Sequence, residues 1–390
     1  MATATELVAR ARALQPVLRE RAAAADQARS LPAETIRDFQ DAGFFKILQP
    51  ERWGGYEMDP QVFFDVQMAL AEACMSSGWV YGILAVHNFQ LGLFDLKAQE
   101  DVWSGDPTTL IASTYQPVGK ITRVDGGFRL SGRWSFSSGC EHGAWMFLGA
   151  IVPPGGEGDP PHMRTFLLPK GDYTIVDTWH TFGLKATGSH DIVVDDAFIP
   201  EHRTHKASDG FLCTNPGQAV NRGPLFQIPW AQVFVRSIST ASLGGARGAV
   251  AAYAELARSR VSTNTGKTAK ADPVAQAALA KAVGDIDEMD AVLHRNFDRI
   301  MALLRAGEPI PMEDRIRYRY QSTTVARRCA DHVNGLIRFL GGRAAFNSNP
   351  LVRYWLDLNA AQLHVANDPS GIYGSLSGTV LGEDVQEVFV

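Results

Sequence analysis

Residues 128–139 read Phe128-Arg-Leu-Ser-Gly-Arg-Trp-Ser-Phe-Ser-Ser-Gly139 and give the clearest indication of the fold. Apolar Phe128 and Leu130 alternate with polar residues, which is the period of a strand with one buried face. The turn Asp125-Gly-Gly127 precedes the stretch, and another short alternating run, 121–124, precedes the turn. Two such runs joined by a glycine turn predict a β-hairpin.

The sequence around this hairpin divides into three regions. The period of two continues over about 108–205, where further short strands separated by Gly/Pro turns are expected at 145–152, 165–168, 173–176 and 192–194. Before and after this region the apolar residues recur at spacings of three and four residues, as in amphipathic helices. We therefore expect an N-terminal helical domain at 1–107, a central β-domain at 108–205 and a C-terminal helical bundle at 206–390.

The C-terminal region is predicted to hold a four-helix bundle preceded by a connection. Long alanine-rich helical patterns suit such a bundle, and they cover 233–260, 272–306, 311–341 and 350–366. The connection at 206–227 contains Gly, Pro and Asn and is predicted to be a surface loop or a lid.

The composition indicates a globular enzyme. The 390 residues are 45% hydrophobic and carry a net charge of −5, which leaves no basic surplus for nucleic acid or an anionic membrane. The four cysteines are scattered, and the N-terminus reads as an amphipathic helix without the apolar core of a signal peptide. No uncharged apolar run reaches about 18 residues. We therefore expect a cytoplasmic protein without a transmembrane helix.

Several common site motifs are missing from the sequence. It has no GxGxxG segment for a dinucleotide and no GxSxG segment for a serine nucleophile. The pair His202-x-x-His205 has no carboxylate or cysteine at a suitable spacing, so no metal site is expected.

Three segments together resemble the acyl-CoA dehydrogenase superfamily. The stretch 128–139 is similar to a strand pair of that family, Gly183-Leu-Lys-Ala-Thr-Gly-Ser189 to its GxxxTxS segment, and Phe339-Leu-Gly-Gly342 with the following Pro350, Arg353 and Asp357 to a helix junction. The resemblance implies an α+β fold of the acyl-CoA dehydrogenase type, with N-terminal helices, a β-barrel-like middle domain and a C-terminal four-helix bundle.

Further segments resemble one branch of that superfamily, the oxygenase components of two-component flavin-dependent monooxygenases. These segments are residues 76–80, 86–88, 134–142 and 364–369. The resemblance implies that reduced FMN or FAD, supplied by a separate flavin reductase, reacts with O₂ to a C4a-hydroperoxide. One oxygen then passes to an aromatic carbon, usually beside a phenol hydroxyl. The choice between FMN and FAD stays open.

His364 is the predicted catalytic residue, together with Ser138. An acyl-CoA dehydrogenase needs a carboxylate base, which most members hold after the final helix, but 363–367 has none. A phenol hydroxylase needs a group that exchanges a proton near neutrality, and histidine does so. The alternative interpretation is a histidine that only stabilises a helix end.

The resemblance also implies the residues that contact the flavin ring. Ser137 and Ser138 end a strand in a run of small residues, where hydroxyl and amide groups reach a flat polar ring edge; a polar strand end without a ligand is the alternative. Trp79 is expected to wall the ring, or else to be a core residue. The full predicted set of ring contacts is Trp79, Ser113, Thr114, Tyr115, Phe136, Ser137, Ser138, His364 and Val365.

Arg260, Gly342 and Arg343 are predicted to hold the remainder of the flavin. A guanidinium at Arg260 suits a bidentate phosphate contact, with a solvated arginine in an Arg-rich turn as the alternative. The missing side chain of Gly342 would admit the tail of the ligand. Arg343 stands where a small or hydroxyl residue is expected in this family, so it either binds phosphate more strongly or points away. In the superfamily the phosphate contact often crosses to a neighbouring subunit, so the resemblance implies a homo-oligomer, by analogy a homotetramer.

His87 and Asn88 follow an apolar run on a helix and are predicted to contact the substrate, with a polar pair in a core helix as the alternative. The sequence leaves other functions open. Relatives in the same branch oxidise an amino-sugar nitrogen, a thiophene sulfur or indole carbons. An acyl-CoA dehydrogenase and a helical binding protein without catalysis are the remaining hypotheses.

Overall fold

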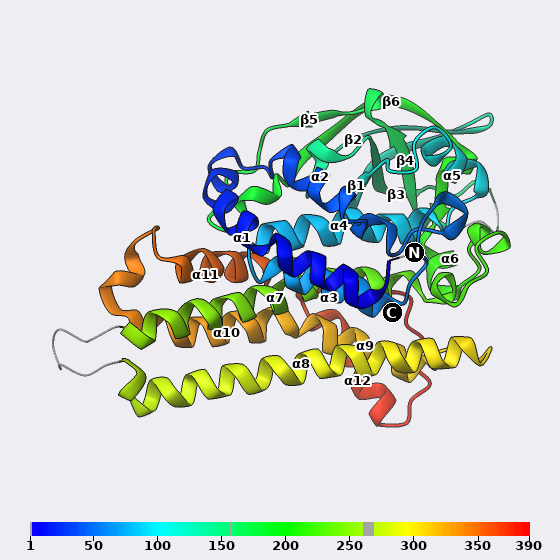
Figure 1. The fold of residues 1–390 in the computed structure, drawn as a ribbon. Helices are drawn as coiled ribbons and strands as arrows, with labels where there is room; N and C mark the ends of the chain where they lie inside the picture. The colour runs from blue at the N-terminus through cyan, green and yellow to red at the C-terminus, as the bar shows by residue number, and fades with distance from the viewer. Residues whose placement is uncertain (1, 157, 159, 260–268) are drawn as a thin grey trace.

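The protein is described by a computed structural model that covers residues 2–156, 158, 160–259 and 269–390. Its ribbon shows a sheet with helices packed beneath it and a long helical bundle as a further layer (Figure 1). In the described part of the chain, no helix is both long and apolar enough to cross a membrane.

The N-terminal third is helical, as predicted. Its first helix begins at a capping box, in which Thr3 accepts from the backbone N–H of Glu6 and the Glu6 side chain accepts from that of Thr3. The helices of this region are α1 (Ala4–Ala28), α2 (Ala33–Asp41), α3 (Pro60–Ala71), α4 (Met75–Leu91) and α5 (Leu96–Trp103).

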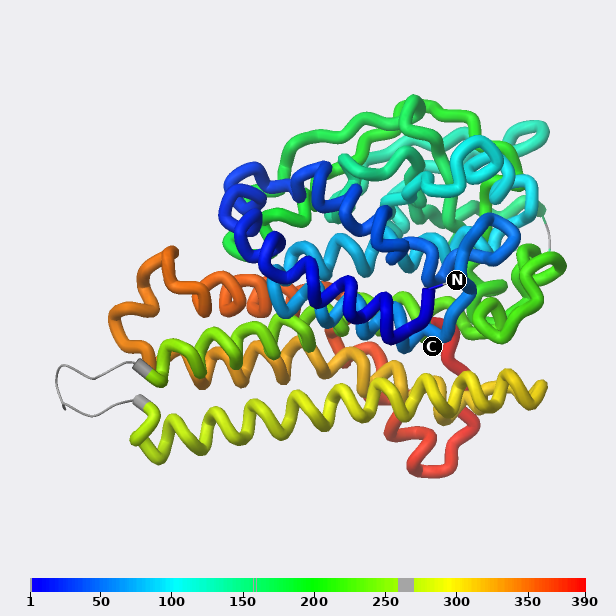
Figure 2. The backbone as a smooth tube through the Cα atoms, viewed as in Figure 1, coloured from blue at the N-terminus to red at the C-terminus, as the bar shows by residue number. Residues whose placement is uncertain are grey.

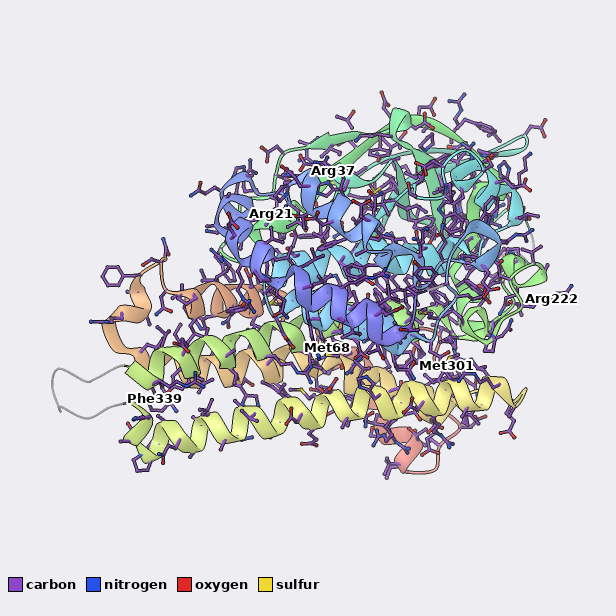
Figure 3. The ribbon with its side chains drawn as sticks, viewed as in Figure 1. Arg21, Arg37, Met68, Arg222, Met301 and Phe339 are labelled. Atoms are coloured by element: carbon purple, nitrogen blue, oxygen red, sulfur yellow. The ribbon has the colours of Figure 1, made fainter. Side chains whose placement is uncertain are left out.

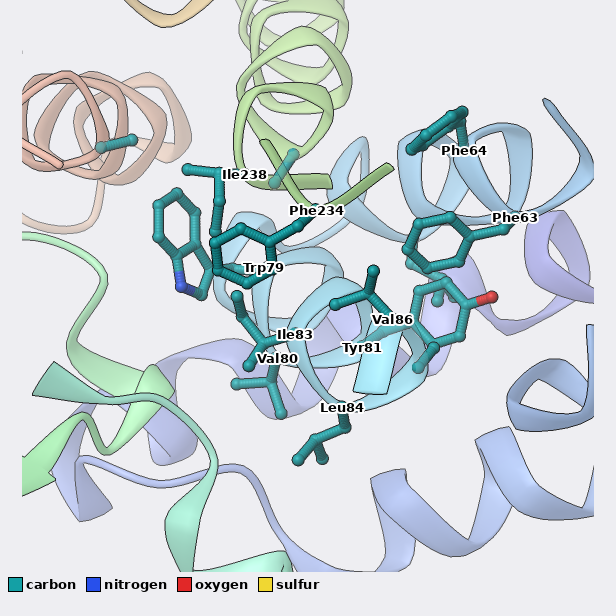
Figure 4. Packing of buried hydrophobic residues seen from close by; sticks show 14 of the residues in the cluster. Phe63, Phe64, Trp79, Val80, Tyr81, Ile83, Leu84, Val86, Phe234 and Ile238 are labelled. Carbon is teal, nitrogen blue, oxygen red and sulfur yellow. The ribbon is translucent and has the colours of Figure 1, made fainter. Parts of the chain in front are cut away.

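Helix α4 lies at the centre of the molecule. All of its residues are buried, as expected of a helix that is covered on every side. It contacts the sheet on one side and helix α7 (Trp230–Ser259) on the other. Figure 4 shows Trp79 of α4 beside Phe234 and Ile238 of α7.

The predicted β-region is a seven-stranded mixed sheet of order β5-β6-β2-β1-β3-β4-β7. The predicted hairpin joins β1 and β2, with Val124 opposite Gly127. Strands β1 and β3 run parallel, and the other neighbours run antiparallel. The strands are β1 (Ile111–Val124), β2 (Gly127–Ser137), β3 (Trp145–Val152), β4 (His162–Pro169), β5 (Thr174–Val176), β6 (His190–Pro200) and β7 (Thr204–Lys206).

The C-terminal helices form the lower layer. Figure 2 shows the chain leaving α10 at one end of the bundle, turning, and returning along α11, which contacts α7. Figure 3 shows side chains filling the space between the layers, with Met68 facing the bundle. The helices after α7 are α8 (Pro273–Arg305), α9 (Met312–Thr323), α10 (Val325–Ile337), α11 (Pro350–Ala361) and α12 (Tyr373–Val380).

Two expectations about this region were wrong in detail. The helix predicted over 311–341 is two helices, because α9 ends at Thr323 and α10 begins at Val325. The connection 206–227 lies partly at the surface but is not simply a loop: it contains α6 (Ala207–Leu212), and Asn221 in it is buried and donates to the Gly92 carbonyl at 2.8 Å. Phe226 of the same segment is buried and stacks on Phe89.

Candidate active site

Three predicted residues from distant parts of the chain meet at one end of α4. The Trp79 Nε1–H donates to Ser138 Oγ at 3.1 Å. The Trp79 ring lies edge-on to the His364 imidazole, with ring centroids 5.7 Å apart. Ser138 directly follows β2, and His364 caps the short helix η11 (Val365–Asn367) after α11. The structure therefore brings segments from all three predicted domains together at this point.

Two residues without a predicted role extend this contact. Ser189 Oγ lies 2.8 Å from Ser138 Oγ and 2.7 Å from Thr187 Oγ1, and Thr187 Oγ1 donates to the Leu184 carbonyl at 2.8 Å. Both hydroxyl residues are buried. They belong to the GxxxTxS segment, so the signal was present in the sequence, but nothing in it showed that the segment folds against Ser138.

A buried carboxylate holds this turn in place. Asp357 Oδ1 of α11 accepts from the backbone N–H of Leu184 at 2.6 Å, and Leu184 has the left-handed φ of 51°. Burial, with the nearby charge of Asp26, raises the pKa of Asp357 to about 7. Helix α11, which also leads to His364, is thereby fastened to the Ser189 turn.

The hydrogen bonds of His364 define its tautomer. The backbone N–H of Ala366 donates to His364 Nδ1 at 3.0 Å, so Nδ1 carries a lone pair and the proton of the neutral ring is on Nε2. Burial, and secondarily the nearby Arg319 guanidinium, lowers the pKa of His364 to about 4. The His364 side chain is partly exposed in the isolated chain. Its burial and the positive charge of Arg319 nevertheless both lower its pKa. The ring is therefore neutral near pH 7, with Nε2–H as its donor.

Apolar side chains around these polar groups are exposed. Phe136 is 60% exposed, Leu363 72% and Val365 81%. Large apolar surfaces beside a few directed polar groups are typical of a site for a flat aromatic ligand. Phe136 also has a left-handed φ of 68°, and its ring lies edge-on to Trp179.

The predicted contacts on and beside β1 divide into two groups. Thr114 Oγ1 donates to the Ser135 carbonyl at 2.8 Å, and the fully buried Ser137 donates to Met146 Sδ at 3.4 Å. The proton of each hydroxyl is thus used within the β-domain. Ser113 and Tyr115, two residues apart, share the other face of β1, where the Tyr115 ring packs edge-on to Trp230 and Phe234 of α7.

His87 and Asn88 point to different sides of α4. His87 Nδ1 lies 2.6 Å from the Ile111 carbonyl, which assigns the proton to Nδ1, and the buried Nε2 has no partner among the described residues. Burial lowers the pKa of His87 to about 4. Asn88 instead donates to the Phe45 carbonyl at 2.7 Å.

The predicted contacts to the flavin tail lie apart from this cluster. Gly342 and Arg343 are exposed in η10 (Arg338–Ala345), at the far end of α10. A Cβ at Gly342 would meet no described atom within 4 Å, so nothing in the described chain requires glycine there. Arg260 lies outside the described residues.

A cavity of about 420 Å³ lies elsewhere, among α8, α9 and α10, with Tyr320 and Arg328 in its wall. Its lining includes none of the predicted site residues. The candidate site is therefore defined by its hydrogen bonds and exposed apolar groups, and not by this cavity.

Comparisons with known proteins show the family of this chain. The family models of the acyl-CoA dehydrogenase N-terminal and C-terminal domains match residues 3–95 and 236–369. The chain is 41% identical to the oxygenase subunit HsaA of a flavin-dependent monooxygenase from Mycobacterium tuberculosis, over 92% of this chain and 91% of that subunit. It is 32% identical to the oxygenase component of an FADH₂-dependent resorcinol hydroxylase from Rhizobium sp., over 97% and 93% of the two chains.

A crystal structure of HsaA from M. tuberculosis superposes with a TM-score of 0.94 at 38% identity and covers 100% of both chains. The match thus includes the segments that carry Trp79, Ser138 and His364. The chain belongs to the acyl-CoA dehydrogenase family and, within it, to the oxygenase components of two-component flavin-dependent monooxygenases.

Proposed function

We propose that this chain hydroxylates a phenolic aromatic substrate with reduced flavin and O₂, and that Trp79, Ser138 and His364 form its catalytic centre. The observation that carries the proposal is the meeting of these three residues beside exposed apolar side chains. A separate flavin reductase supplies the reduced flavin, as the two-component family requires.

The residues at the site fit a flavin ring. Phe136 and Val365 offer apolar surface, and Ser138 adds a hydroxyl at its edge. When bound, reduced flavin supplies the electrons that activate O₂. We propose that Ser113 and Tyr115 face the same ring from β1. Thr114 and Ser137 stay predictions; because their hydroxyl protons are used within the sheet, any flavin contact through these hydroxyls is as an acceptor.

His364 is proposed to act through Nε2–H. A neutral imidazole whose Nδ1 accepts from Ala366 donates from Nε2 to an oxygen of the substrate or of the reacting group. Its low pKa keeps this donor form present across the neutral range. This geometry favours a donor role over the role of a base, which would require the ring to give up its bond to Ala366.

The substrate is proposed to be a phenol. The unpartnered Nε2 of His87 is a buried acceptor that a phenol hydroxyl would satisfy. This acceptor requires an N–H or O–H group on the substrate, so it disfavours a thiophene but fits an indole or an amino sugar as well as a phenol. The choice of a phenol is supported by the related resorcinol hydroxylase. Asn88 stays a prediction, because its amide is bonded on the other side of α4.

The dehydrogenase alternative receives no support from the nearby carboxylates. Asp357 is buried and holds the Leu184 amide, and Asp368 is exposed and accepts from Ser370. Neither carboxylate is placed to take a proton from a ligand beside Trp79 and His364. Neither Asp357 nor Asp368 therefore replaces the carboxylate base that an acyl-CoA dehydrogenase holds after its final helix.

The oligomer and the compartment are proposals as well. Val380 and Leu381 are more than three-quarters exposed, and Phe346 is 64% exposed, which supports burial against further copies in a homotetramer. We propose that Gly342, Arg343 and Arg260 bind the flavin tail only in that assembly. All four cysteines are free thiols, in accord with a cytoplasmic protein.

The test is a product assay. The protein would be mixed with reduced FMN or FAD and ¹⁸O₂ in the presence of resorcinol or p-hydroxyphenylacetate. We expect an added hydroxyl that carries one ¹⁸O atom, formed only with the protein present. Flavin oxidation without labelled product from any phenol would contradict the proposed reaction.

A further inference from the structure

The hydroxyl groups behind Trp79 form a chain of hydrogen bonds with only one possible direction. A carbonyl oxygen only accepts, so the 2.8 Å contact between Thr187 Oγ1 and the Leu184 carbonyl uses the Thr187 hydroxyl proton. Ser189 must therefore donate to Thr187 across their 2.7 Å contact. Since the Ser189 proton is then used, Ser138 must donate to Ser189 across 2.8 Å.

The other end of the chain agrees with this direction. The Trp79 indole nitrogen is only a donor, and it donates to Ser138 Oγ at 3.1 Å. The order is thus Trp79 to Ser138 to Ser189 to Thr187 to the Leu184 carbonyl, with every proton assigned. We refer to these five groups as the hydroxyl relay.

The relay restricts what Ser138 offers to a ligand. A serine hydroxyl has one proton and two lone pairs, and in the relay its proton and one lone pair are occupied. The remaining lone pair of Ser138 Oγ accepts and does not donate. Ser138 is 8% exposed, against 4% for Ser189 and 1% for Thr187, so it is the hydroxyl of the relay most accessible to a ligand.

We propose that Ser189 and Thr187 are positioning residues that hold the Ser138 hydroxyl as an acceptor, so that the site prefers reduced over oxidised flavin. Reduced flavin carries a proton on N5, whereas N5 of oxidised flavin is itself an acceptor. An acceptor at Ser138 would form a hydrogen bond with the N5–H of reduced flavin, and it would repel the N5 lone pair of oxidised flavin. The inference rests on the proposed function, because it takes the ring that Ser138 contacts to be a flavin.

The turn that carries the relay is rigidly placed. The Leu184 carbonyl accepts the last hydrogen bond of the relay. The Leu184 N–H donates to the buried Asp357 at 2.6 Å. The Leu184 carbonyl also accepts from Trp179 Nε1 at 2.9 Å. With the last acceptor fixed by α11 and by Trp179, the direction of the relay does not depend on a mobile group.

The test compares the affinities for oxidised and reduced FMN in Ser189→Ala. This variant removes the acceptor of the Ser138 proton, which then turns toward the ligand and favours oxidised FMN. We expect the preference for reduced over oxidised FMN to fall about ten-fold, which corresponds to a shift of about 30 mV in the two-electron potential of bound FMN. Ser242→Ala is the matched control, since Ser242 is a buried serine of α7 whose hydroxyl has no described partner.

A second pair of variants tests Thr187. Thr187→Val keeps the shape and removes the hydroxyl, and we expect the preference for reduced FMN to fall. Thr187→Ser keeps the hydroxyl and should restore the preference. A wild-type ratio of affinities in Thr187→Val would overturn the role of Thr187.

The outcomes separate this inference from the proposed function. An unchanged ratio in Ser189→Ala, with reduced FMN bound as tightly as in wild type, would overturn the relay and leave the proposed function standing. Wild-type protein that shows no preference for reduced FMN would contradict the relay and the use of reduced flavin together.

Discussion

His364 is held in one protonation state by its own backbone. It accepts from the Ala366 N–H at Nδ1, and burial and the charge of Arg319 keep the pKa of the ring at about 4. The sequence alone suggested a histidine that titrates near neutrality. The structure instead shows a neutral ring with a fixed donor at Nε2.

His364→Asn tests this donor. Asparagine is a good capping residue, so it should keep the bond to Ala366 while it removes the Nε2–H group. We expect product formation to slow about 10²-fold, with unchanged affinity for reduced FMN. Single-turnover measurements of product and flavin would show this, and a wild-type yield of product per flavin oxidised would contradict the assignment.

The sequence named Trp79, Ser138 and His364 because each lies in a motif of the family, and the structure places the three side chains together. Their contact with flavin stays a prediction, and the residues that support them were not predicted. Ser189 and Asp357 lie in quoted motifs too, yet their roles depend on a left-handed turn at Leu184 that meets a helix more than 170 residues later. A single sequence does not show such a contact.

At the scale of elements, helix α11 sets the geometry of the site. Its Asp357 holds the Leu184 turn, and its end leads into His364. The backbone of α11 lies so close to this turn that a Cβ at Gly183 would be 2.2 Å from the Leu356 carbonyl oxygen. Close approach of two backbones is thus the reason for glycine at position 183.

Gly183→Ala should force α11 and the turn apart. We expect a loss of about 1–3 kcal/mol in the free energy of unfolding and weaker binding of reduced FMN. Gly284→Ala is the control, because a Cβ there meets nothing within 4 Å and alanine favours a helix. Urea unfolding and FMN titration would test both variants, and equal behaviour of the two would contradict the account of this contact.

The sequence predicted the type of most elements but not every boundary. Strand β3 was predicted at its observed residues, since its apolar run is bounded by clear turns. The break between α9 and α10 was missed. There Thr323 and Thr324 donate their hydroxyls to the carbonyls of Tyr320 and Gln321, and such bonds bend a helix. Helical periodicity alone does not reveal them.

At the scale of the whole molecule, stability should depend on pH through buried neutral histidines. Burial lowers the pKa of His87, His205 and His364 to about 4. The unfolded chain binds these protons below about pH 6.5, while the folded chain does not until about pH 4. The stability present above pH 6.5 is therefore lost as the pH falls toward 4. Asp357 acts in the opposite direction, because its pKa is raised, and the three histidines outweigh it.

His205→Gln isolates one of these groups away from the site. The His205 Nε2 lies 2.8 Å from Asn215 Oδ1, a contact that a glutamine amide can replace. We expect wild-type protein to lose unfolding free energy between about pH 6.5 and about pH 5, and the variant to lose up to about 2 kcal/mol less. The same pH dependence in both proteins would contradict a neutral His205 in the folded state.

We propose that Trp79, Ser138 and His364 surround reduced flavin while it reacts with O₂. To test this, the protein would be loaded anaerobically with reduced FMN and mixed with oxygenated buffer without any substrate, and the return of oxidised FMN would be followed by absorbance. We expect a delay relative to free reduced FMN, and a shorter delay in Ser138→Ala. Return of oxidised FMN at the rate of the free flavin would contradict it.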